Sequence, residues 1–98
     1  MIYVDTPFRV SVNHPTAPRC FRGRLSAHLM ADSDEELLAY ARSIGMRPSW
    51  IQKPGTPRSH FDVTGSRLTR ALGDSKVRKL SLLETVDLLR SRFSERRK

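Results

Sequence analysis

The fold is decided by residues 25–45, LSAHLMADSDEELLAYARSIG. In an extended backbone, alternate side chains face the same way, and residues 25–31 show the alternation of a strand with one buried face. The inward face is expected to hold Leu25, Ala27, Leu29 and Ala31. The other face is expected to hold Ser26, His28 and Met30.

A helix is expected directly after this strand. Ser33 and Glu36 have the spacing of a capping box, and the acidic residues around them suit the positive end of a helix dipole. Gly45 is placed to end the helix in a left-handed conformation. The apolar stripe at helical spacing consists of Leu37, Leu38, Ala41 and Ile44.

Further elements lie on both sides of this unit. Strands are predicted at 2–4 and 60–63, an ambiguous strand or extended segment at 76–80, and a helix at about 66–72. A last helix opens with a second capping box, Ser81 and Glu84. Its predicted stripe is Leu82, Val86, Leu89 and Phe93. We therefore predict an α/β protein, with α+β as the alternative: a small single-layer mixed sheet of three to four short strands with about three helices packed on it.

The length of 98 residues predicts a single domain over 1–98. That domain contains a loop rich in proline and arginine at 6–24, and a basic, frayed C-terminus at 94–98. Cys20 is the only cysteine, so no internal disulfide is expected. No segment has the pattern of a signal peptide or of a membrane-spanning helix, which favours the cytoplasm and no membrane partner.

The formal net charge of +8 favours polyanionic partners. Candidate nucleic-acid contacts are Arg19, Arg22 and Arg24 in the loop, together with Lys53. The alternative is that the positive surface only keeps a small protein in solution.

Polar residues at the predicted strand ends are the candidates for catalysis. They are Asp5, His28, His60 and Asp62. His60 and Asp62 are two residues apart on a strand, so their side chains share a face and could hold a divalent cation or orient one imidazole. A pair of this kind is more often a structural hydrogen-bonded pair. No cofactor is therefore predicted, and a divalent metal is kept as the alternative.

A second set of candidates is expected to bind a ligand. Trp50 lies in a loop between prolines and near cationic residues, with Gln52 close by, so it could stack on a base or instead plug the core. Ser66 and Arg67 open a predicted helix, where they could meet a phosphate or simply cap the helix. The sequence contains no Walker loop, paired CxxC or GxSxG motif.

The motifs resemble a small family catalogued as domain of unknown function 4031. The matching strings are Tyr3-Val4-Asp5, His28-Leu29, Ala31-Asp32, Glu36-Leu37 with Ala41 and Gly45, Trp50-x-Gln52, His60-Phe61-Asp62, Ser66 and Ala71-x-Gly73. The resemblance covers most of residues 1–80 without the proline-rich loop, and it implies a bacterial or bacteriophage origin. It also implies that Asp5, His28, Trp50, Gln52, His60 and Asp62 belong to one motif set. The family brings no activity.

Three functions fit these features. The first in rank is a small, basic, phage-derived accessory protein that binds nucleic acid or phosphate-bearing ligands. The second is a phage accessory or inhibitor protein that binds an acidic host protein. The third is a small metal-dependent or His/Asp-dependent hydrolase of the phosphodiesterase type. A binding protein is expected ahead of an enzyme.

Overall fold

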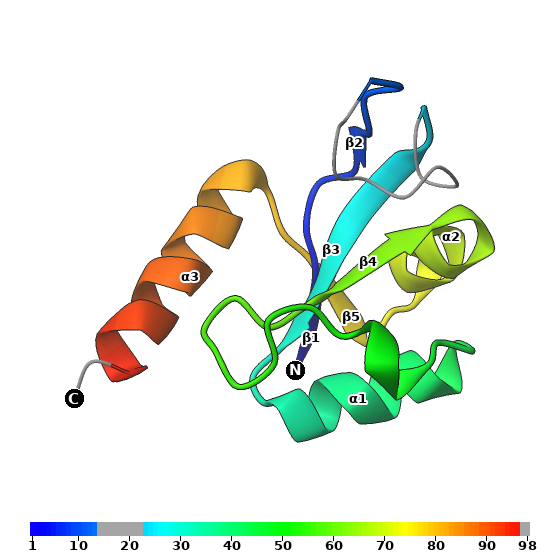
Figure 1. The fold of residues 1–98 in the computed structure, drawn as a ribbon. Coiled ribbons are helices and arrows are strands. Elements are labelled where there is room, and N and C mark those ends of the chain that lie inside the picture. Colours follow the sequence, from blue (N-terminus) through cyan, green and yellow to red (C-terminus); the bar gives the residue numbers. More distant parts are fainter. Residues whose placement is uncertain (14–22, 97–98) are drawn as a thin grey trace.

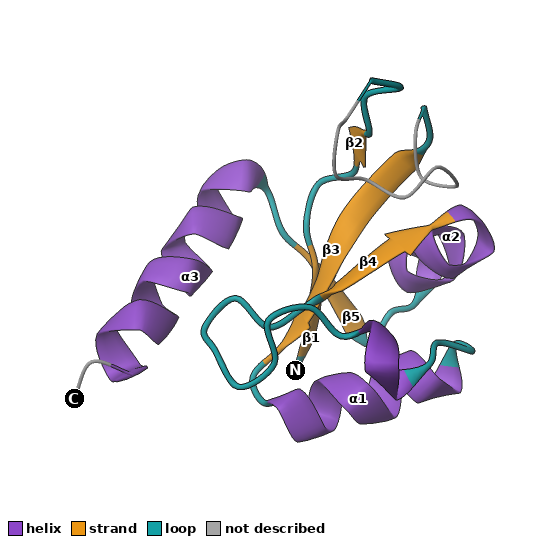
Figure 2. Cartoon of the chain, viewed as in Figure 1, coloured by secondary structure: helices purple, strands orange, loops and turns teal. Residues whose placement is uncertain are grey.

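A computed structural model describes residues 1–13 and 23–96, with side chains as far as Ser91. The strands in this part are β1 (Ile2–Val4), β2 (Phe8–Arg9), β3 (Leu25–Ala31), β4 (Phe61–Thr64) and β5 (Val77–Lys79). The helices are α1 (Asp34–Ser43), α2 (Gly65–Gly73) and α3 (Leu82–Arg96), and η2 (Pro48–Trp50) is a single 3-10 turn. Figure 1 shows their arrangement and Figure 2 their types.

β3 is the central strand of one mixed sheet. β4 pairs antiparallel with residues 26–29 of β3. β1 and β2 pair antiparallel with the two ends of β3, so they share its other edge. β5 completes the sheet by pairing parallel with β1. The predicted α/β class with a mixed sheet is confirmed, and the ambiguous segment around 76–80 contains a strand.

β2 is the strand that the sequence did not indicate. It contains only two residues, both exposed, and it lies in the segment interpreted as an irregular loop. Two residues are too few to show an alternating pattern, so only the pairing with β3 reveals this strand.

One face of the sheet is covered by α1 and α2. The buried core on this side consists mainly of Ile2, Val4, Ala27, Leu29, Phe61, Val63 and Val77 from the strands, with Leu37, Ala41, Leu68 and Ala71 from the helices. These strand residues alternate with the polar residues of β3 and β4, so the opposite face of the sheet carries the polar side chains.

The burial expected along β3 needs a correction. Leu25, predicted inward, is exposed, whereas Ser26 and Met30, predicted on the outer face, are buried. Phe8 lies opposite Ser26 in the ladder and Tyr3 lies opposite Met30, so each has an aromatic residue from the neighbouring strand beside it. Leu25 begins the strand and has only Arg9 as its partner in the β2 ladder.

The predicted burial of the last helix is wrong over its first turns. Leu82 is 74% exposed, and Val86 is also exposed. α3 projects from the body instead of packing on the sheet (Figure 1). An apolar stripe predicts that a helix face seeks a partner, but it does not specify which one. None of the helices in the described segments is both long and apolar enough to cross a bilayer.

The predicted caps are mostly confirmed. Ser33 Oγ accepts the backbone N–H of Glu36, but the Glu36 carboxylate binds the ammonium group of Met1 instead of returning to Ser33. Ser81 and Glu84 form the full reciprocal box. Gly45 follows α1 with a φ of +84°, in the left-handed region.

Candidate metal centre

Four polar residues meet on the sheet face opposite α1 and α2. His28 on β3 lies directly opposite Asp62 on β4 in the ladder, so both side chains project to the same side. Asp5 follows β1, and its N–H donates to the carbonyl of His28. His60 precedes β4 and pairs through its backbone with Gln52, which extends the ladder by one bridge.

Asp5 fixes both the backbone and the ring of His28. One carboxylate oxygen of Asp5 accepts the backbone N–H of His28 at 2.7 Å, and the other lies 2.6 Å from His28 Nδ1. A carboxylate can only accept, so this nitrogen carries the hydrogen. Nε2 of the same ring is turned toward Asp62 Oδ1, at 3.8 Å.

His60 is oriented in the same way by a different acceptor. Its Nδ1 lies 2.6 Å from the carbonyl oxygen of Arg58, so it donates there. Its Nε2 faces Asp62 Oδ1 at 3.4 Å. The rings of His28 and His60 meet edge to face, with 4.9 Å between their centroids.

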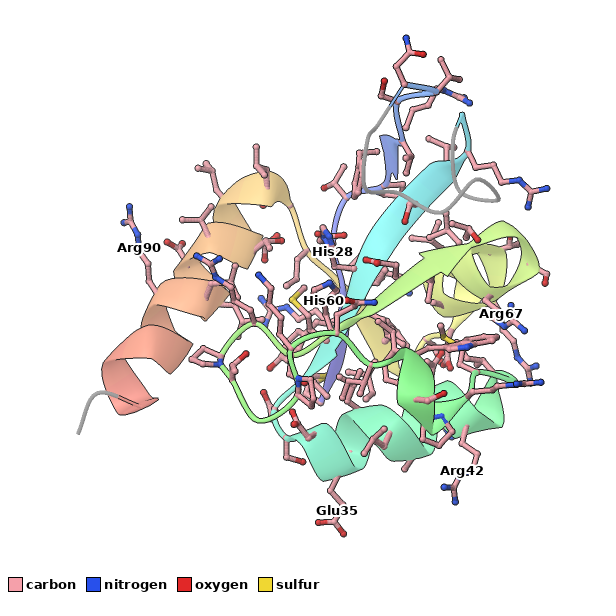
Figure 3. The ribbon with its side chains drawn as sticks, viewed as in Figure 1. His28, Glu35, Arg42, His60, Arg67 and Arg90 are labelled. Carbon is pink, nitrogen blue, oxygen red and sulfur yellow. The ribbon has the colours of Figure 1, made fainter. Side chains whose placement is uncertain are left out.

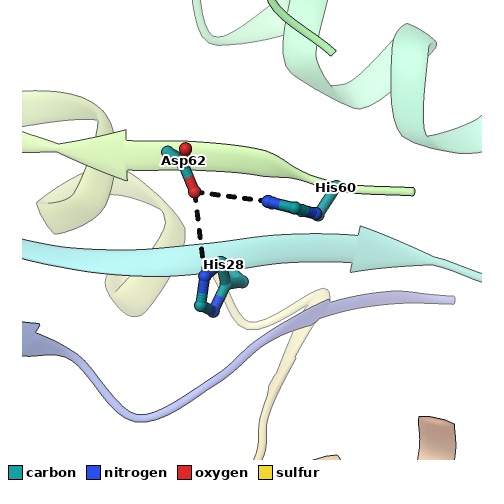
Figure 4. A group of neighbouring side chains, drawn as sticks. All are labelled: His28, His60 and Asp62. Atoms are coloured by element: carbon teal, nitrogen blue, oxygen red, sulfur yellow. Dashed lines mark ion pairs between the residues drawn. The ribbon is translucent and has the colours of Figure 1, made fainter. Parts of the chain in front are cut away.

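Three atoms with lone pairs therefore converge. Because both Nδ1 atoms are committed as donors, Nε2 carries the lone pair of each ring in its neutral form. Figure 4 shows how the two rings and the carboxylate of Asp62 lie, with the contacts of each Nε2 to Asp62 dashed. One ligand atom from each of His28, His60 and Asp62 lies within 4.8 Å of the other two. Lone pairs that face one another in this way repel each other unless a hydrogen-bond donor or a cation lies between them, and the three atoms are close enough together to hold a metal ion.

The pKa values follow the same geometry. The hydrogen bond to Asp5, aided by the charges of Asp5 and Asp62, raises the pKa of His28 above its ordinary value although burial opposes this. When Nε2 of His60 carries a proton, its hydrogen bond to Asp62 lowers the pKa of Asp62, again against the effect of burial. The site thus attracts a positive charge and keeps Asp62 ionised.

Comparison with known proteins identifies the family. The family model described as a protein of unknown function, DUF4031, matches residues 10–90. The chain belongs to this family. The match includes most of the proline-rich loop and most of α3, which the resemblance of motifs did not cover, and it begins directly after β2. No curated protein and no solved structure matches the chain.

In this DUF4031 chain Gln52 lies on the same side of the sheet as the cluster, whereas Trp50 does not. Gln52 lies opposite His60 in the ladder, so its side chain shares the face of the cluster. Trp50 is 41% exposed and belongs to the helical layer, where the guanidinium of Arg67 lies 5.3 Å from its ring centroid. Trp50 therefore does not plug the core, and it lies apart from the cluster with which the resemblance of motifs groups it.

Ser66 and Arg67, the other predicted ligand-binding residues, lie in the first turn of α2. Arg67 also donates to the carbonyl of Gly45. Figure 3 shows Arg67 beside α1 and α2, away from His28 and His60. This part of the predicted site is thus separate from the cluster of His28, His60 and Asp62.

The predicted nucleic-acid contacts are only partly described. Arg19 and Arg22 lie outside the described residues. Arg24 lines an open hollow of about 410 Å³ together with Arg9 and the first residue of α2, Gly65. Lys53 is exposed in the loop before β4, with a φ of +49°.

Sequence reasoning missed two contributors to the cluster. The carbonyl of Arg58 orients His60, which no side-chain pattern can indicate because every residue has a carbonyl. The ring of Phe8 lies beside His28, with 5.4 Å between centroids. Phe8 follows Asp5 closely in the sequence, but only the pairing of β2 with β3 brings it to this face.

Proposed function

We propose that this DUF4031 chain is a metal-dependent hydrolase of phosphate esters, with the metal bound by Nε2 of His28, Nε2 of His60 and the carboxylate of Asp62. One observation carries the proposal: both imidazoles donate from Nδ1 to a fixed acceptor and turn Nε2 toward the same carboxylate oxygen. Histidines that bind metals in proteins show this arrangement, with the second ring nitrogen held by a carboxylate or a backbone carbonyl.

The donor set favours a transition metal. Two imidazoles and one carboxylate bind Zn²⁺ and Fe²⁺ well, and three protein ligands leave coordination positions for water and substrate. The side chains of His28 and Asp62 are 38% and 32% exposed, so a substrate can reach them.

Such a site suits hydrolysis. A bound divalent metal lowers the pKa of a water ligand and polarises the bond to be cleaved. The oxygen of water forms the new bond to phosphorus, the ester P–O bond breaks, and the leaving oxygen takes up a proton. The products are an alcohol and a phosphate.

The charge of the protein supports an anionic substrate. At a formal net charge of +8, the protein attracts phosphate esters at long range. The sequence favoured a binding protein over an enzyme. The convergence of the three ligand atoms is the reason for reversing that order here, while nucleic acid and an acidic host protein stay predictions as partners.

Metal analysis combined with matched variants tests the proposal. The untagged protein should bind Zn²⁺ or Mn²⁺ in a one-to-one ratio and should hydrolyse bis(p-nitrophenyl) phosphate or p-nitrophenyl phosphate when loaded. Asp62→Asn and His60→Ala should lose both properties. Asp87→Asn, the same chemical change at an exposed position of α3, should lose neither. Failure of the wild type to bind metal, or full hydrolysis by Asp62→Asn, would overturn the proposal.

A further inference from the structure

An exposed aromatic ring stands next to the metal centre. Phe8 is 43% exposed, and its ring is tilted by 33° from that of His28 with 5.4 Å between the two centroids. Phe8 lies opposite Ser26 in the antiparallel ladder, and Ser26 and His28 are two residues apart on β3. Phe8 therefore projects to the same face of the sheet as His28 and Asp62.

The backbone around Phe8 is held in place. β2 pairs with β3, and the next residue after it, Val10, is buried. The N–H of Val10 donates to the carbonyl of Arg24, and the carbonyl of Val10 accepts the N–H of Gly23. The ring is thus presented to solvent from a paired strand, not from a free end.

We propose that Phe8 is the platform on which a planar base of the substrate stacks while its phosphate lies at the metal centre, so that the substrates are nucleotides. The inference rests on the proposed function and names its substrate class. A large apolar ring that remains exposed beside a polar site gains stability when a planar group covers it, and stacking on an aromatic ring accepts any base. Trp50 does not serve this purpose, since it lies in the other layer against Arg67.

Phe8 would then set specificity without touching the reacting bond. A nucleotide contacts Phe8 through its base and the metal centre through its phosphate. A sugar phosphate or inorganic phosphate contacts only the metal centre. Binding of the phosphate depends on the metal ligands, and preference for a base depends on Phe8. These two properties can be measured separately.

Equilibrium titration of the zinc-loaded protein tests the inference, with AMP, ribose 5-phosphate and inorganic phosphate as ligands. AMP should bind about 5-fold to 150-fold more tightly than ribose 5-phosphate, the range expected for stacking one base on one ring. Phe8→Ala should remove this preference, Phe8→Trp should keep it, and all three proteins should bind the same amount of zinc. Leu83→Ala, which truncates an exposed apolar side chain on α3, should behave as wild type.

The outcomes separate the two proposals. Equal affinity of the wild type for AMP and ribose 5-phosphate, with zinc and phosphate still bound, overturns the role of Phe8 and leaves the hydrolase intact. Loss of zinc from Phe8→Ala would show that the ring only supports His28, which also overturns it. A wild type that binds neither zinc nor phosphate overturns the proposed function itself. A short single-stranded oligonucleotide tested beside AMP shows whether the base belongs to a free nucleotide or to a strand end.

Discussion

Asp5 holds His28 at two points, with one oxygen on the backbone N–H at 2.7 Å and the other 2.6 Å from ring Nδ1. The carboxylate therefore joins the end of β1 to the middle of β3 and at the same time decides which ring nitrogen is left for a metal. The same side chain thus holds the backbone of β3 and orients the ring of His28, so a substitution of Asp5 tests both roles.

Replacing Asp5 by Asn should lower the pKa of His28. The amide no longer supplies a negative charge, and burial then favours the neutral ring. An NMR titration of the metal-free protein should show the His28 pKa above 6.5 in the wild type and clearly lower in Asp5→Asn. Metal affinity should fall by about 10-fold to 100-fold, as for other residues that orient a metal ligand. Identical titration curves for the two proteins would contradict this role of Asp5.

The stability of the metal-free protein should depend on pH in two opposite ways. His28 has a raised pKa in the folded state, so its contribution is complete below 6.5 and is lost as the pH rises through the folded value. Asp62 has a lowered pKa, so its contribution is present above 3.8 and is lost as the pH falls through the folded value. Urea unfolding with EDTA from about pH 3 to about pH 9 should show both declines.

Added zinc should offset the loss of stability that the metal-free protein shows as the pH rises. Metal binding requires an unprotonated Nε2, so the stabilisation by added zinc should grow as the pH rises through the pKa of His28. In Asp62→Asn the zinc-dependent part should be absent at every pH. Stabilisation by zinc that does not change with pH would argue against His28 as a ligand.

Two leucines should respond very differently to truncation. Leu37 is 1% exposed beneath the sheet, so Leu37→Ala leaves a cavity and should cost about 2–5 kcal/mol of unfolding free energy. Leu82 is 74% exposed at the start of α3, so Leu82→Ala should change stability by less than about 0.5 kcal/mol. Urea unfolding of both variants measures the difference. A large loss in Leu82→Ala would mean that α3 is covered in solution.

These contrasts show which signals the sequence carries. Caps are local, so Ser33, Ser81 and Gly45 could be interpreted from neighbouring residues alone. The alternation of Phe61 with Asp62 likewise predicts which of the two is buried. The burial of Met30 depends on a distant strand, and the exposure of Leu82 depends on where a whole helix lies. Neither is encoded nearby.

The candidate site divides along the same line. That His60 and Asp62 share a face follows from the period of a strand. Their approach to His28 depends on the pairing of β3 with β4, which the sequence does not specify. The carbonyl of Arg58 and the ring of Phe8 were missed because the backbone path alone brings them to the site. The resemblance of motifs groups Trp50 with the cluster, but its contact with Arg67 places it in the other layer.

Gly45 and Gly73 allow the cost of a positive φ to be measured separately from steric crowding. A Cβ at Gly45 or at Gly73 would meet no atom within 4 Å, so neither substitution is limited by space. Gly45 has a φ of +84°, and Gly45→Ala should destabilise the protein by about 1–2 kcal/mol. Gly73 ends α2 without a positive φ, and Gly73→Ala should be neutral or stabilising by up to about 1 kcal/mol. Thermal unfolding of the two variants gives the comparison, and equal shifts would contradict it.

Binding to polyanions should depend steeply on salt. Each phosphate that is neutralised contributes a slope of about −0.9 to the plot of log affinity against log salt concentration for duplex DNA. Replacing Arg19, Arg22 and Arg24 together with Ala should reduce both the affinity and this slope. Gel shifts with random DNA and RNA at two salt concentrations measure the effect. Binding that persists unchanged in high salt would exclude an electrostatic contact.

The parallel pairing of β1 with β5 governs how the protein can be made on the ribosome. β1 leaves the exit tunnel before the other strands. Its pairing with β5, in which Ile2 lies opposite Val77, can form only after β5 has been synthesised. Until then the nascent chain can pair β1 with β3 on one side only, and the backbone groups on its other edge are open to pairing with other chains. The sheet is therefore completed late in synthesis, as expected for a pairing so distant in sequence.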